Sequence, residues 1–153
     1  MIYFVDEDVS QIGSWATILR VRGHETCIIR NADLAYEQLT SCQNAHIVFI
    51  DVMLAASPNP QERRFLSEDT DNFHSTGLRL LKALNLINPI VFPKRAVLLS
   101  HTGKPIILAK IENVCQEFQI PFWRKRSFGD LHDFSIKAEQ HLLTLNHAAK
   151  GGL

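Results

Sequence analysis

The 153-residue sequence lacks the features that mark several large classes of protein. Its three cysteines, Cys27, Cys42 and Cys115, are widely spaced and form no C-x-x-C pair. They fit neither a disulfide framework nor a zinc site, which favours a reducing compartment. No apolar run approaches the roughly 18 residues of a membrane span, and the N-terminus, MIYFVDED, is acidic where a signal peptide is basic. We therefore expect a cytoplasmic, soluble protein.

An excess of one charge is also absent, because Lys+Arg and Asp+Glu number 16 each. No net field favours nucleic acid or an anionic membrane, so we expect no direct contact with either. Hydrophobic residues make up 46% and charged residues 21%, as in ordinary globular proteins. The length predicts one domain, which we assign to residues 1–145, and the patternless residues 146–153 predict a flexible tail.

Several catalytic motifs are missing as well. There is no Gly-rich dinucleotide fingerprint and no nucleophile elbow, and the seven histidines show no metal-ligand spacing. The Thr102-Gly103-Lys104 run resembles the end of a phosphate-binding loop, but the upstream glycine is missing. A phosphatase of the DxD type would need a second Asp two residues after Asp51, where Met53 stands.

What the sequence does contain is an alternation of short apolar runs and amphipathic stretches. Apolar runs predict five strands, and the spacing of apolar residues between and after them predicts five helices. The expected strands are Ile2–Val5, Thr26–Ile29, the part of AHIVFIDVML that ends at Asp51, Arg95–Ser100 and Ile120–Trp123. The expected helices begin near Ser10, near Asn31 or Asp33, at Thr76, at Ile106 and at Phe128.

Strict alternation of strands and helices predicts an α/β fold, a doubly wound five-stranded parallel sheet with helices on both faces. We expect the flavodoxin-like strand order 2-1-3-4-5, which periodicity alone does not decide. The least regular segment is residues 55–75, an inserted loop after the third strand. A loop of this length inside a compact domain is either functional or disordered.

Polar residues follow the ends of the strands. If the first and third strands are neighbours, Asp6 and Glu7 lie beside Asp51. Carboxylates this close repel one another, so one stays protonated or a cation binds, and oxygen ligands suit Mg²⁺. The fourth strand ends at Ser100, and Lys125 follows the fifth. Carboxylates, a metal, a hydroxyl and an ammonium group together predict a site for a phosphoryl group carried on Asp51.

Five segments in order carry a resemblance to a known family: VDED at 5–8, FIDVM at 49–53, TGLRLLKAL at 76–84, VLLS at 97–100 and FWRK at 122–125. Over residues 2–145 the sequence resembles the receiver domain of two-component response regulators. The resemblance implies that Asp51 is the phosphoacceptor and that Asp6, Glu7, Asp51 and the backbone carbonyl of Met53 bind Mg²⁺. It also assigns Ser100, Lys125 and Phe122 to phosphate binding and switching. Because His101 follows Ser100, we expect it to be a candidate for the rim of the pocket.

The sequence departs from the family at three places. The loop that begins at Ala55 is much longer than usual. Arg126 replaces the proline that usually follows the lysine, and because a cis non-proline bond costs ~3–4 kcal/mol, we expect this bond to be trans. Glu7 replaces the commoner Asp as a metal ligand, so its longer side chain would shift the ion.

Each residue also has a simpler structural explanation. The acids after the first strand favour a helix N-terminus, Ser100 could cap a helix, and Lys125 could lie in a solvated basic turn. Phe122 could be a core aromatic, and a lone His101 has several ordinary roles.

Three hypotheses about function follow. The first is a receiver that accepts phosphate from a histidine kinase or phosphotransfer protein and signals to an unknown downstream protein. It would be no enzyme beyond self-catalysed phosphotransfer and autodephosphorylation. The second is a degenerate receiver that acts as a binding or homodimerisation module without phosphorylation. The third is a Mg²⁺-dependent hydrolase, although nothing obvious positions an attacking water.

Overall fold

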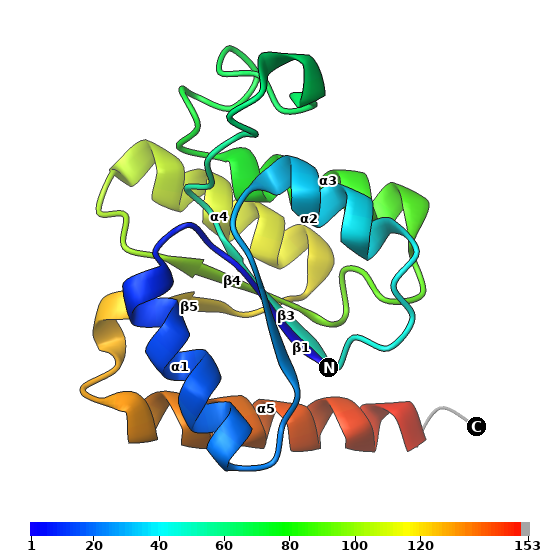
Figure 1. Ribbon diagram of the computed structural model, residues 1–153, viewed down its shortest axis with the longest axis vertical. Helices are drawn as coiled ribbons and strands as arrows, with labels where there is room; N and C mark the ends of the chain where they lie inside the picture. Colours follow the sequence, from blue (N-terminus) through cyan, green and yellow to red (C-terminus); the bar gives the residue numbers. More distant parts are fainter. Residues whose placement is uncertain (151–153) are drawn as a thin grey trace.

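Five short apolar segments form one parallel sheet in the computed structural model, which describes residues 1–150 (Figure 1). The strands are β1 (Ile2–Val5), β2 (Thr26–Ile29), β3 (Ile47–Asp51), β4 (Ala96–Ser100) and β5 (Phe122–Arg124). Every residue of β3 and β4 is buried, as expected for central strands covered on both faces. The strand order is β2-β1-β3-β4-β5, so the predicted flavodoxin-like order is confirmed.

Helices cover both faces of the sheet. The helices are α1 (Val9–Val21), α2 (Ala32–Thr40), α3 (Thr76–Ile87), α4 (Pro105–Phe118) and α5 (Leu131–Lys150), with two short 3₁₀ helices, η1 (Pro60–Glu62) and η2 (Lys125–Ser127). Figure 1 shows α1 and α5 on one face and α2, α3 and α4 on the other. Each face has its own apolar core, and on the α1–α5 side several aromatic rings pack around Phe134 in stacked, tilted and edge-on contacts.

The structure differs from the sequence-based expectation at the start of α1 and at the end of α5, and it decides between the two candidate caps of α2. Asp8, not Ser10, caps α1, because the Asp8 carboxylate accepts both the Gln11 N–H and the Ser10 hydroxyl. Asn31, one of the two candidates, caps α2. Helix α5 continues to Lys150, where a flexible tail was expected from residue 146, and residues 151–153 of that tail lie outside the described residues.

Residues 52–75 connect β3 to α3 and contain only η1 as regular structure. This connection is nevertheless attached to the domain. Both carboxylate oxygens of Asp33 accept backbone N–H groups from it, Ser57 at 2.7 Å and Arg64 at 2.6 Å. The Arg64 guanidinium lies 4.2 Å from the centre of the Tyr36 ring. In Figure 1 the connection rises beyond the helices at the top of the view.

Parallel pairing aligns the carboxyl ends of the strands. Val5 pairs with Ile50 across β1 and β3, and Asp51 pairs with Leu99 across β3 and β4. Ser100 is the last residue of β4, and Lys125 follows β5 directly. The polar residues that follow these strands therefore meet at one edge of the sheet, which is where open α/β sheets bind ligands.

Candidate functional site

Two carboxylates are buried at this edge. Asp6 follows β1 and Asp51 ends β3, and the two are 1% and 6% exposed. Because β1 and β3 are hydrogen-bonded neighbours, the fold brings the two acids together although they are far apart in sequence. The sequence-based expectation that these two meet agrees with the observed pairing.

Lys125 completes a buried cluster with the two acids. Its side chain is 2% exposed, and its Nζ lies 2.6 Å from Asp6 Oδ2 and 3.4 Å from Asp51 Oδ1. Asp6, Asp51 and Lys125 are called the acid–lysine cluster below. A solvated basic turn is the wrong description of Lys125, because its neighbours Arg124 and Arg126 are exposed while its own side chain points inward. Such burial of an ammonium group requires a charge partner.

Burial dominates the electrostatics of the cluster. Desolvation raises the pKa of Asp51 to about 7; Lys125 opposes this shift, and the charge of Asp6 adds to it. Burial likewise raises the pKa of Asp6, and Lys125 again opposes the shift. Two carboxylates face one ammonium group, so the cluster carries a net negative charge whenever both acids are ionised.

Asp6 is incompletely satisfied. Its Oδ1 accepts the backbone N–H of Asp8 at 2.9 Å. Its Oδ2 lies close to Lys125 Nζ, yet among the described residues it accepts no well-aligned hydrogen bond. The Lys125 ammonium group thus already pairs with this oxygen, so a metal ion bound there would share the oxygen with Lys125 or displace it.

The predicted phosphate-binding and switch residues lie around the cluster with different exposures. Ser100 is 1% exposed, and its Oγ accepts the N–H of Thr102 at 3.0 Å. Phe122 is half-buried at the start of β5 and packs against the core on the α2–α3–α4 side. His101 is exposed, and its Nε2 lies 2.9 Å from Gln11 Oε1. Partial desolvation of its ring and the charge of Lys125 lower its pKa.

The predicted metal ligands are only partly assembled. Glu7 is exposed, and its side chain makes no hydrogen bond or ion pair within residues 1–150. Within residues 1–150 there is no group of three His, Cys, Asp or Glu side chains arranged to hold a metal. Met53 is half-buried just beyond Asp51, and its backbone helps to lower the pKa of that acid. The structure thus unites Asp6, Asp51 and Lys125 and leaves Glu7 outside.

Gly77 lies at the site, although no role was predicted for it from the sequence. A Cβ added there would lie 2.0 Å from the backbone oxygen of Asp51, and the Gly77 N–H donates to the Val52 carbonyl at 3.0 Å. Only glycine permits this approach of α3 to the end of β3. The sequence feature that could have indicated this role is a glycine in the first turn of a helix that directly follows a long loop.

The backbone beside Lys125 is ordinary. Among residues 1–150 the one cis peptide bond is Phe92–Pro93, so the bond between Lys125 and Arg126 is trans, as expected when Arg126 replaces a proline. Within the same range, no helix combines the length and the apolar character that a membrane span requires.

Comparison with known proteins shows which fold family the structure resembles. No protein-family model matches the sequence, and no curated protein matches it. Among solved structures, a CheY-like response regulator receiver domain protein from Methanospirillum hungatei aligns over 96% of both chains with a TM-score of 0.67 and 14% identity. The receiver domain of NtrX from Brucella abortus aligns over 94% of this chain and 99% of its own, with a TM-score of 0.65 and 23% identity.

This chain has the receiver-domain fold. A third receiver domain, from a putative Luxo repressor protein of Vibrio parahaemolyticus, agrees, with 99% of this chain and 96% of its own aligned at a TM-score of 0.66 and 12% identity. The receiver fold identified from five sequence segments is therefore confirmed by similarity that extends over nearly the whole chain.

Proposed function

We propose that this chain is a phosphoacceptor receiver in two-component signal transduction. It takes a phosphoryl group onto Asp51 from a histidine kinase or phosphotransfer protein, and it passes the signal on by protein contact. The observation that carries the proposal is the buried acid–lysine cluster at the ligand-binding edge of a receiver fold. A charged cluster that lacks full hydrogen bonding is costly to bury, so a role in chemistry accounts for it better than stability does.

The transfer requires Asp51 as a nucleophile. One Oδ of ionised Asp51 attacks the phosphorus, and the bond to the donor nitrogen of a phosphohistidine breaks. That nitrogen keeps the electron pair, and the ring leaves as a neutral imidazole because its second nitrogen carries a proton. The product is an acyl phosphate on Asp51. Lys125 neutralises charge on the phosphoryl oxygens, and Ser100 donates its hydroxyl to one of them. Ser100 moves towards the phosphoryl group, and Phe122 repacks towards Ser100.

The cluster fits a divalent cation. With both acids ionised it carries one uncompensated negative charge, because one ammonium group faces two carboxylates. Asp6, Asp51 and the Met53 carbonyl would hold Mg²⁺, with water in its other positions. When bound, Mg²⁺ supplies positive charge to the phosphoryl oxygens and favours the ionised form of Asp51.

The partners follow from this role. The donor is a histidine kinase or phosphotransfer protein, and the output is a contact with a downstream protein or a second copy through the α4–β5–α5 face. Because such kinases transfer phosphate inside the cell, the proposal places the chain in the cytoplasm. The chain turns over no external substrate beyond self-catalysed phosphotransfer and autodephosphorylation.

Intact mass after incubation with acetyl phosphate and Mg²⁺ tests the proposal. We expect the mass of one phosphoryl group on the wild type, and none on Asp51→Asn. Asp8→Asn is the matched control, because Asp8 is an exposed acid at the same edge, and it should be modified like the wild type. An unmodified wild type, or a modified Asp51→Asn, would contradict the proposal.

The second candidate is a degenerate receiver that binds a partner without phosphorylation. The observations that favour it are the exposed Glu7 and a Lys125 ammonium group closer to Asp6 than to Asp51. Titration with Mg²⁺ separates the two. Trp123 precedes Lys125 by two residues, so its fluorescence should respond at millimolar Mg²⁺ in an active receiver and stay constant in a degenerate one.

A further inference from the structure

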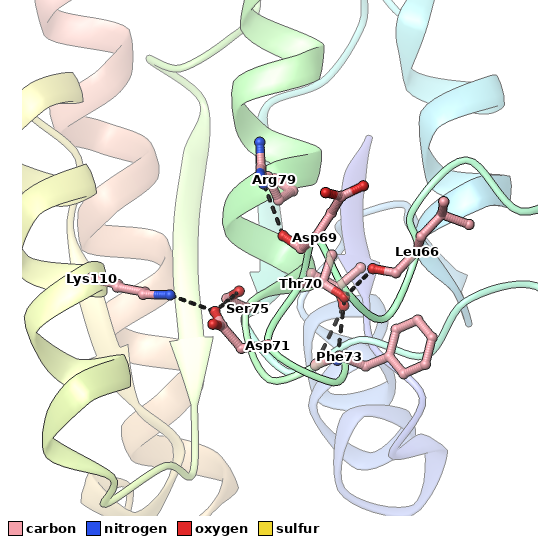
Figure 2. Close-up of polar contacts among 9 residues, drawn as sticks. Leu66, Asp69, Thr70, Asp71, Phe73, Ser75, Arg79 and Lys110 are labelled. Carbon is pink, nitrogen blue, oxygen red and sulfur yellow. Dashed lines mark hydrogen bonds and ion pairs between the residues drawn. The ribbon is translucent and has the colours of Figure 1, made fainter.

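The second half of the β3–α3 connection, residues 66–75, is folded around a buried threonine. Thr70 is 0% exposed, its hydroxyl donates to the Leu66 carbonyl at 2.7 Å and accepts the Phe73 N–H at 3.3 Å (Figure 2). The Ser75 N–H donates to the Thr70 carbonyl. This segment, called the strap below, therefore has a defined conformation of its own.

The strap contains backbone strain. Asp71, Asn72 and Phe73 have φ values of 53°, 53° and 66°, so three consecutive residues adopt the left-handed conformation without a glycine. Asp and Asn tolerate this region, but Phe rarely enters it. A strained run of this kind persists only where its surroundings hold it.

Side-chain contacts hold the strap to the neighbouring helices. Asp71 Oδ2 accepts from Lys110 Nζ of α4 and from Ser75 Oγ, both at 2.6 Å, and Figure 2 shows these contacts converging. Arg79 Nε of α3 donates to the Asp69 carbonyl at 3.1 Å. At the β4–α4 loop, Lys104 Nζ lies 2.8 Å from His74 Nε2.

The strap is linked to the acid–lysine cluster in two ways, through α3 and through the β4–α4 loop. Ser75 is followed directly by α3, whose Gly77 packs against the backbone of Asp51. On the other side, the Lys104 N–H donates to Thr102 Oγ1, and the Thr102 N–H donates to Ser100 Oγ. The strap thus connects the phosphoacceptor strand to the loop that carries the predicted phosphate-binding hydroxyl.

We propose that the strap restrains the β4–α4 loop and the start of α4, so that phosphorylation of Asp51 has to work against it. This inference rests on the proposed function, in which Ser100 moves towards the phosphoryl group. That movement carries Thr102 and Lys104 with it and loosens the contacts to His74 and Asp71. Contacts that exist only before the movement lower the affinity of the site for a phosphoryl group.

The test measures the affinity for beryllium fluoride, with Mg²⁺ present, in variants that lack the ion pair between the strap and α4. Asp71→Asn keeps the shape and the tolerance of left-handed φ but removes the charge, and Lys110→Gln removes its partner. Because exposed ion pairs contribute weakly, we expect each variant to bind about two- to fivefold more tightly. The affinity of the double variant should be little higher than that of either single variant, since both substitutions remove the same contact.

Lys82→Gln is the matched control, because Lys82 pairs with Glu117 between the same two helices at 3.5 Å, and within residues 1–150 it makes no ion pair with the strap. It should leave the affinity unchanged. Equal affinity in wild type, Asp71→Asn and Lys110→Gln would overturn the proposal, as would an equal gain in Lys82→Gln.

Hydrogen exchange without any phosphoryl analogue separates this proposal from the function on which it rests. Asp71→Asn and Lys110→Gln should speed amide exchange in residues 100–108 and in the strap, while Lys82→Gln should not. The wild type could fail to bind beryllium fluoride while amide exchange still rises in the two variants. That result would contradict the phosphoacceptor role and support the restraint by the strap. Unchanged exchange in both variants would overturn the restraint itself.

Discussion

Asp33 and Asp51 are both buried carboxylates, 5% and 6% exposed, but their surroundings are opposite. Asp33 accepts two short hydrogen bonds from backbone N–H groups of the β3–α3 connection. Asp51 shares one lysine with a second buried acid, and burial raises its pKa to about 7. A buried acid whose oxygens are occupied by backbone donors stabilises structure, whereas one whose charge is poorly compensated is available for chemistry.

The largest expected effect comes from removing the shared cation. Lys125→Met keeps the volume and leaves Asp6 and Asp51 buried without a positive partner. Breaking a buried pair in this way costs about 3–5 kcal/mol, so the free energy of unfolding should fall by about that amount at pH 8. Urea unfolding measures it.

Acid should reduce this loss, because protonation neutralises the carboxylates left behind. The same variant at pH 5 should therefore be closer to wild type. An equal loss at both pH values would show that Lys125 acts through packing and not through charge, and the contrast between Asp33 and Asp51 would lose its basis.

Gly77→Ala should be the next most damaging change. It tests the point where the connection meets the cluster, because the added methyl group would lie 2.0 Å from the Asp51 backbone oxygen and α3 would have to shift. Overpacking against backbone costs about 3 kcal/mol. Gly13→Ala is the control, since a Cβ there meets nothing within 4 Å and alanine favours a helix. A stable Gly77→Ala protein would mean that α3 approaches β3 less closely.

Asp33→Ala should cost about 2–3 kcal/mol, because it removes the acceptors of two backbone N–H groups and Ser57 is buried. The matched control is Asp69→Ala, an exposed acid in the same connection whose backbone oxygen is its contact to Arg79. Urea unfolding gives the cost, and hydrogen exchange should rise in residues 55–65. If Asp33→Ala matched Asp69→Ala, the connection would not depend on Asp33.

The two regions also differ in what the sequence predicts of them. Asp6, Asp51, Ser100 and Lys125 could be placed together because each follows a strand, and parallel strands align their carboxyl ends. Asp33 could not, since a contact between one side chain and a distant loop backbone has no period in sequence. It was only a candidate cap for α2, a role that belongs to Asn31. Likewise, the loop length showed that residues 55–75 were unusual but could not show whether they are ordered.

The smallest expected effect is the pH dependence of stability. The folded pKa of Asp51, about 7, lies above its ordinary value of 3.8, so between these values the folded state binds a proton that the unfolded state has lost. Stability from this group is therefore full below pH ~4 and is lost as pH rises through about 7. Without Mg²⁺, the free energy of unfolding should fall by about 1.4 kcal/mol between pH 6 and pH 8.

Asp51→Asn should remove this slope, and Asp33→Asn should leave it in place, although the protein is less stable throughout. Mg²⁺ should flatten the slope of the wild type, because a cation favours the ionised form of Asp51. A slope that survived Asp51→Asn would belong to another group, and the Asp6 carboxyl, whose pKa burial also raises, would be the one to test. A slope that disappeared in Asp33→Asn instead would reverse the roles assigned to the two acids.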